Sequence, residues 1–187
     1  MEPKKLAHAI GLIAWGYLFL HFNVTLGTLN MIPSWVGYLM MSKAIKELKE
    51  ASPAMVLLSP LCILLAALEL WFWTLTLIGI DSQHYLLQLL SLLLAVAALY
   101  FHFQLLTNLV EALGRAGETW QKELLNLRTV RTVLAAVMAL PVLWNEHLAV
   151  TVILAIAGGL VGISISVVLF WIRNALLKSL WSAEEKK

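Results

Sequence analysis

An acidic residue, Glu69, stands inside a strongly apolar stretch, within the run AALELWFW at residues 66–73. If this stretch lies in a membrane, burying the carboxyl group costs a few kcal/mol, and such a residue usually faces the interior of a helix bundle. Helical spacing places Cys62, Glu69 and Trp73 on one face. The pattern predicts an anionic group that binds a cation, a proton or a ligand donor, with Trp73 as an aromatic wall. The alternative is a protonated Glu69 that is hydrogen-bonded to a neighbouring helix.

Other polar and aromatic side chains gather at a similar predicted depth. Tyr17, His21 and Thr25 recur every four residues on the first apolar segment, which places them on one helical face. An aromatic belt at the membrane interface explains some of the eight tryptophans, but it explains neither Glu69 nor His21. The candidate ligand-binding residues, drawn from four segments, are Tyr17, His21, Trp35, Tyr38, Glu69, Trp73 and Trp144.

A second polar stripe follows one face of the segment that begins near Tyr85. Its members are His84, Gln88, Ser91 and His102. The sequence contains no HExxH motif, and Cys62 is its single cysteine, so no metal ligand set and no particular cofactor can be assigned.

Three alternatives to a binding site stay open. A haem would need His21 and His102 at one depth, but a rise of 1.5 Å per residue puts them about 22 Å and about 15 Å from the cytoplasmic ends of their helices. A membrane enzyme would need a convergent catalytic set, for which His21 and Glu69 are the available acid–base pair. An accessory or scaffold subunit would use its polar groups to hold helices together. The pattern leans away from an enzyme.

The composition identifies the solvent in which these side chains must fold. Of 187 residues, 61% are hydrophobic and 13% are charged, and the mean hydropathy is +0.85, unlike an ordinary soluble domain. A spanning helix needs about 20 mostly apolar residues. We therefore predict an all-α, polytopic transmembrane helical bundle that forms a single domain over residues 1–187. Its expected spans are Leu6–Leu29, Met31–Leu48, Pro53–Ile80, Tyr85–Val110, Val130–Trp144 and Leu148–Leu180, of which the second is short.

The positive charges set the expected orientation, because Lys and Arg near span ends stay in the cytoplasm. With six spans, all 13 lysines and arginines, Arg128 and Arg131 included, fall in cytoplasmic segments. With five spans, the alternative, Lys4 and Lys5 move outside. The sequence thus predicts a multi-pass protein of the cell membrane with both termini cytoplasmic. The net charge of +2 is too small to suggest a nucleic-acid partner.

Small residues predict close helix packing. Gly158 and Gly162 form a GxxxG pattern in the last segment, while Ala7, Gly11 and Ala14 form a stripe on the first. Packing within the chain is the favoured explanation, and dimerisation is the alternative.

The layout resembles the substrate-binding components of energy-coupling-factor vitamin transporters, which have short hydrophobic spans, an outer-half pocket and small residues on the first span. The resemblance implies a small-molecule ligand and partner membrane subunits, although Ala7 and Gly11 match the docking motif of those components only in part. The local pattern Asn30-x-x-Pro33-x-x-x-Gly37-Tyr38 is similar to a motif in uncharacterised small bacterial polytopic membrane proteins, which implies a bacterial inner membrane.

These features together favour an integral membrane protein that binds or transports a small molecule. Its expected site is an outward-facing aromatic pocket with an intramembrane acid, and its expected surroundings are the lipid bilayer.

Overall fold

The computed structural model describes residues 2–22, 25–26, 29–30, 33–79, 85–114, 118–140 and 148–184. Within these ranges the chain forms six helices and two short strands. The helices are α1 (Pro3–His21), α2 (Ser34–Leu48), α3 (Met55–Leu77), α4 (Tyr85–Leu113), α5 (Glu118–Ala139) and α6 (Leu148–Glu184). The strands β1 (Thr25–Leu26) and β2 (Leu29–Asn30) pair antiparallel, with Leu26 opposite Leu29. The predicted helical fold class is confirmed.

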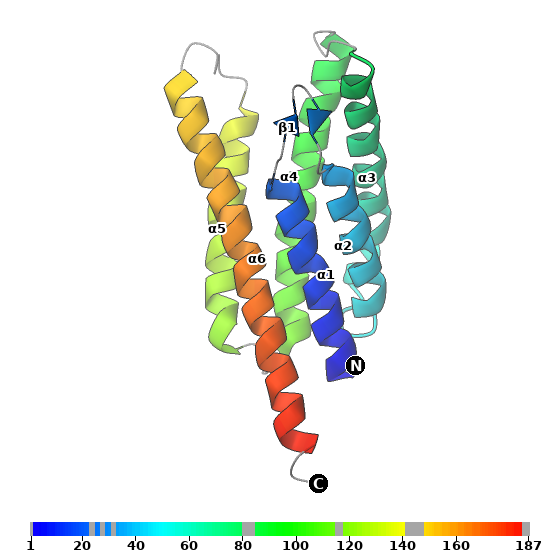
Figure 1. Ribbon diagram of the computed structural model, residues 1–187, viewed down its shortest axis with the longest axis vertical. Helices are drawn as coiled ribbons and strands as arrows, with labels where there is room; N and C mark the ends of the chain where they lie inside the picture. Colours follow the sequence, from blue (N-terminus) through cyan, green and yellow to red (C-terminus); the bar gives the residue numbers. More distant parts are fainter. Residues whose placement is uncertain are drawn as a thin grey trace.

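The six described helices stand side by side as a bundle (Figure 1). Each packs against the next helix in sequence, and α6 packs against α1, so the helices close into a ring. The two ends of the chain lie at the same end of the bundle, where the last turns of α6 project beyond the other helices (Figure 1). The β1–β2 pair lies past the other end of α1.

Three of the described helices, α3, α4 and α6, are long and apolar enough to cross a membrane. Their outer faces carry large apolar side chains, and Leu57 and Leu86 are 78% and 75% exposed. Exposing such area to water costs about 25 cal/mol per Å². A lipid bilayer is therefore the solvent that fits this surface.

The first helix is shorter than the sequence predicted. The expected span reached Leu29, whereas α1 ends at His21 and is followed by the β1–β2 pair. In the sequence, Gly27 and Thr28 separate the two strand segments, and a glycine first in a two-residue connection is typical of a hairpin. The prediction of one long span used hydropathy alone and did not take this pattern into account. By contrast, α2 begins directly after Pro33, where a helix start was expected.

The fifth helix starts earlier than the sequence predicted. The expected span began at Val130, but α5 is one helix from Glu118 to Ala139. Its first half is polar and still helical, because Glu, Lys, Gln, Leu and Arg are good helix formers. Arg131 therefore lies inside a helix that packs against α4 and α6.

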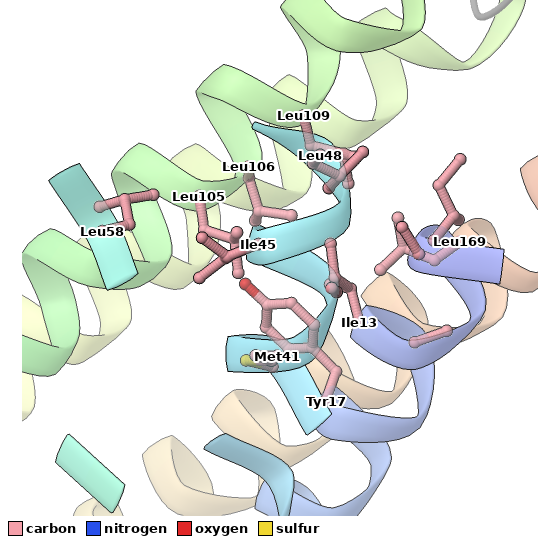
Figure 2. Close-up of a cluster of buried hydrophobic side chains, with 14 of the residues drawn as sticks. Ile13, Tyr17, Met41, Ile45, Leu48, Leu58, Leu105, Leu106, Leu109 and Leu169 are labelled. Atoms are coloured by element: carbon pink, nitrogen blue, oxygen red, sulfur yellow. The ribbon is translucent and has the colours of Figure 1, made fainter. Parts of the chain in front are cut away.

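The core lies where α1, α2 and α4 meet. Figure 2 shows the side chain of Tyr17 entering this cluster from α1. The largest fully buried side chains come from α1, α2, α3 and α4 and include Ile13, Tyr17, Met41, Ile45, Leu58, Phe101, Leu105 and Leu106. This interior holds α1 and α2 against α4, and it fixes the positions of the polar groups described next.

Close packing depends on small residues at two helix contacts. A β-carbon on Gly37 would lie 2.7 Å from the Gly16 carbonyl oxygen, so α1 and α2 touch through their backbones. On the other side of α1, the Ser166 hydroxyl of α6 donates a hydrogen bond of 2.8 Å to the Ala14 carbonyl. Arg173 of α6 covers Gly11. The small-residue stripe on α1 thus packs against a helix of its own chain.

Candidate functional site: a buried His–Tyr–Arg cluster

His102 of α4 lies between two tyrosines from other helices. Its Nδ1 is 3.1 Å from the Tyr17 hydroxyl of α1, and its Nε2 is 3.4 Å from the Tyr38 hydroxyl of α2. All three side chains are at most 3% exposed. A neutral imidazole has one N–H donor and one acceptor, so one tyrosine donates to the ring and the other accepts from it. The three groups form one continuous hydrogen-bonded chain.

His21, the last residue of α1, is held in one tautomer by two partners. Its Nδ1 lies 2.8 Å from the Tyr17 carbonyl oxygen, and its Nε2 lies 3.1 Å from Nη1 of Arg131. The carbonyl can only accept and the guanidinium can only donate. The ring proton is therefore on Nδ1, and the Nε2 lone pair accepts from Arg131. Gly162 makes room for this ring, because a β-carbon there would collide with it.

Arg131 joins the two histidine environments. Its guanidinium carbon lies 5.5 Å from the centre of the Tyr17 ring, within the range of a cation–π contact. In the part of the chain that the structure describes, no Asp or Glu carboxylate pairs with this guanidinium. His21 ends α1 at the end opposite Lys4 and Lys5, so Arg131 does not lie beside these two lysines, with which it was grouped in the sequence analysis.

Two cavities border Arg131. One, of about 280 Å³, lies between α4 and α5 and is lined by Ala95, Ala98, Leu99, His102, Arg131, Thr132, Ala135, Met138 and Ala139. The other, of about 130 Å³, lies between α1, α5 and α6 and is lined by His21, Arg131, Leu134, Ala135, Met138, Leu154, Ala155 and Gly158. Arg131, Ala135 and Met138 border both. A single guanidinium is thus presented to both spaces.

Arg128, one turn earlier on α5, shows a different use of the same side chain. Its Nη1 donates a hydrogen bond of 2.8 Å to the Thr107 hydroxyl, and its guanidinium carbon lies 4.3 Å from the centre of the Phe103 ring. Both partners belong to α4, so Arg128 braces α4 against α5. Neither cavity described above is lined by Arg128.

The structure brings together four of the residues that the sequence singled out, namely Tyr17, His21, Tyr38 and His102. Tyr17, His21 and Tyr38 come from the predicted ligand-binding set. His102 comes from the polar stripe, and it shares no cluster with the other described members of that stripe. Gln88 and Ser91 are exposed, and the Ser91 hydroxyl donates to the Gln88 carbonyl.

The remaining predicted residues lie elsewhere. Glu69 is half-buried on α3. Trp73 is half-buried on the same helix. On α2, the half-buried Trp35 has a buried indole N–H without an acceptor among the described residues. His84 and Trp144 lie outside the described residues.

Arg131 is the residue that sequence reasoning missed. It stands directly after Val130, at the start of the predicted span, and it was counted among the cytoplasmic charges. A signal was present, because Arg131, Ala135 and Met138 share a helical face at intervals of four and three residues. Treating Arg131 as part of the span predicted from Val130 would have placed it on the same face as Ala135 and Met138.

The depth argument about the two histidines needs correction. The Tyr17 ring contacts both imidazoles, with ring centres 6.1 Å from His21 and 5.2 Å from His102. Both nitrogens of each ring nevertheless have protein partners, which leaves none free for a haem iron. Among the described residues, no group of three or more His, Cys, Asp and Glu side chains could hold a metal ion.

Tyr17, His21, Tyr38, His102 and Arg131 are called the His–Tyr–Arg cluster below. Four helices supply them, α1, α2, α4 and α5. The cluster combines a cation with groups that donate and accept protons, and it adjoins a space large enough for a small ligand. No protein-family model, curated protein or solved structure matches this chain.

Proposed function

We propose that this chain is an integral membrane protein that binds a small molecule inside its helix bundle, at the His–Tyr–Arg cluster. The observation that carries the proposal is Arg131, which borders two cavities and has no carboxylate partner among the described residues. A charged side chain at membrane depth is costly, and it usually marks a substrate or ion site when it faces the bundle interior. A bound ligand would supply the missing partner.

The contrast with Arg128 favours binding over a scaffold role. The two arginines have similar partners within the protein, since each makes one hydrogen bond and one cation–π contact. Arg131 differs because it also borders both cavities on α5, beside Ala135 and Met138, whereas Arg128 lines neither of them. Small residues at these positions leave a cavity where larger ones would fill the core.

The aromatic pocket around Glu69 is the competing site for a ligand. Glu69 and Trp73 would bind a cation. Tyr38 links this side of the bundle to His102, because its carbonyl accepts a hydrogen bond from the Cys62 thiol of α3 and its hydroxyl contacts His102. Arg131 would repel a cation close to it, so the two sites favour ligands of opposite charge. The volume of the cleft beside His102 and Arg131 favours the Arg131 site over the aromatic pocket.

The cluster is also proposed to face the outer half of the membrane. In this arrangement all six helices cross, both termini are cytoplasmic, and His21 at the far end of α1 lies toward the outside. Support comes from the lysines near the end of the bundle where the chain begins and ends, because cytoplasmic segments retain Lys and Arg. Lys4, Lys5, Lys43, Lys46, Lys49 and Lys178 belong to this set.

A cysteine-accessibility experiment tests the orientation. Single cysteines at Lys5, Ile78 and Lys178 would be introduced with Cys62→Ser, and intact cells would be treated with a membrane-impermeant maleimide. With six spans, only the cysteine at Ile78 is expected to react from outside, while the other two react after permeabilisation. Labelling at Lys5 from outside would instead support the five-span arrangement, with Lys178 as the inner marker.

Binding is tested by blocking the larger cavity. Ala135→Phe places a bulky ring in the space next to Arg131, whereas Ala136→Phe changes the neighbouring, exposed residue of the same helix. We expect native mass spectra from a mild detergent to show a bound small molecule in the wild type and in Ala136→Phe, and to lose it in Ala135→Phe.

The same measurement separates the two candidate sites. Glu69→Gln keeps the shape of the side chain and removes its charge, so it should leave the bound mass in place if the ligand occupies the Arg131 site. A mass that is lost in Glu69→Gln and retained in Ala135→Phe would move the site to the aromatic pocket. A bare chain in every variant would support the scaffold alternative.

A further inference from the structure

The cleft between α4 and α5 has one charged end. His102, Arg131 and Thr132 supply its polar atoms. A guanidinium carries five N–H donors, and within the described residues Arg131 engages one hydrogen-bond partner, His21, through Nη1. Donors therefore remain for a planar acceptor such as a carboxylate, which Arg binds through two parallel hydrogen bonds.

The rest of the cleft is apolar. Six aliphatic side chains form its wall: Ala95, Ala98, Leu99, Ala135, Met138 and Ala139. Its volume of about 280 Å³ lies just below the roughly 300–1,000 Å³ of sites for drug-sized ligands. A wall without hydrogen-bonding groups fits a hydrocarbon portion, and the volume suits one chain rather than two.

The mouth of this cleft opens toward the lipid-facing surface. Ala95 in its wall is exposed. The next residue on α4, Val96, is 53% exposed, and Val133, which follows Thr132 on α5, is 56% exposed. These side chains belong to the apolar exterior of the bundle. A ligand could therefore enter from the bilayer with its chain among lipids and its head against Arg131.

We propose that the α4–α5 cleft binds a single-chain amphiphile with one anionic head group. The head pairs with Arg131, and the chain lies along the alanine-rich wall. This inference rests on the proposed function and adds the chemical class of its ligand. A free fatty acid and an anionic lysophospholipid, each with one chain, share this chemistry as sources of the negative charge.

Photocrosslinking in lipid nanodiscs tests the inference with the full chain. The probes are a diazirine-bearing fatty acid and the matching fatty alcohol, each at the same mole fraction in zwitterionic phosphatidylcholine, with crosslinked peptides identified by mass spectrometry. We expect the acid to label the cleft segments of α4 and α5 about tenfold or more above the alcohol, since one charge-assisted hydrogen bond is worth that factor.

Variants of Arg131 and Arg128 show which arginine binds the anionic head group. Arg131→Gln is expected to remove the preference for the acid, and Arg131→Lys to retain part of it, because lysine keeps the charge and loses the planar pairing. Arg128→Gln removes an equal charge one turn away and is expected to preserve the preference. The comparison of acid with alcohol in the wild type depends on no variant, so misfolding of Arg131→Gln would not obscure the result.

The outcomes separate the inference from the function on which it rests. Equal labelling by acid and alcohol, both blocked by Ala135→Phe, would overturn the anionic head while the binding site stands. Labelling that Ala135→Phe leaves unchanged would overturn the binding site itself. If lysophosphatidylglycerol added to the nanodisc displaces the acid, the anionic head is supported and a single-chain phospholipid is its source; if it does not, a free carboxylate is.

Discussion

Replacing His102 by leucine is expected to destabilise the folded bundle by about 1–3 kcal/mol. The change removes the shared partner of the Tyr17 and Tyr38 hydroxyls. One buried hydroxyl without a partner costs about 1–3 kcal/mol. Two would cost about twice as much, but polar groups in a membrane also find partners in the unfolded state, so we expect a total close to the cost of one. The measurement is the midpoint of unfolding in a titration with a denaturing detergent, followed by tryptophan fluorescence.

A triple variant tests whether the cost comes from the orphaned hydroxyls. Tyr17→Phe and Tyr38→Phe, combined with His102→Leu, remove both partners together, which is often nearly neutral. The triple variant should therefore be more stable than His102→Leu alone. If it is equally unstable or worse, the loss of packing around the imidazole explains the effect, and the hydrogen-bonded chain contributes little to folding.

The helical fold was predictable because apolar runs of this length have few alternatives in lipid. α3 and α4 start and end within three residues of their predicted limits, since most of their side chains are apolar. The error at α5 has the opposite cause, because hydropathy marks where a helix is apolar rather than where it is helical. The polar turns before Val130 were consequently read as a loop.

The candidate site was predictable only in part. Tyr17, His21 and Tyr38 were found because polar groups inside apolar helices are rare and share a face. The partner of each group could not be found, since helical periodicity gives the face of a residue and not the helix opposite it. Arg131 shows the consequence, because its contact with His21 joins residues 110 positions apart.

In the structure, the motif Pro33-x-x-x-Gly37-Tyr38 lies at the start of α2, where this helix contacts α1. Gly37 lies one residue before Tyr38 and meets Gly16, which lies one residue before Tyr17. The backbone contact between α1 and α2 thus fixes the positions from which the two tyrosines reach His102. A substitution that separates α1 from α2 at this contact should therefore also move the two tyrosines away from His102.

Gly37→Ala is expected to destabilise the bundle by about 1–3 kcal/mol, although alanine is the better helix former by about 1 kcal/mol. The added β-carbon would lie 2.7 Å from the Gly16 carbonyl oxygen, and a backbone atom cannot turn away as a side chain can.

Gly159→Ala is the matched control, because nothing lies within 4 Å of its β-carbon. There the helix preference should dominate, and stability should rise. Midpoints of thermal unfolding, measured under identical detergent conditions, should therefore move in opposite directions for Gly37→Ala and Gly159→Ala. Equal midpoints would mean that α1 and α2 do not touch through their backbones, and the placement of Tyr17 and Tyr38 around His102 would lose its support.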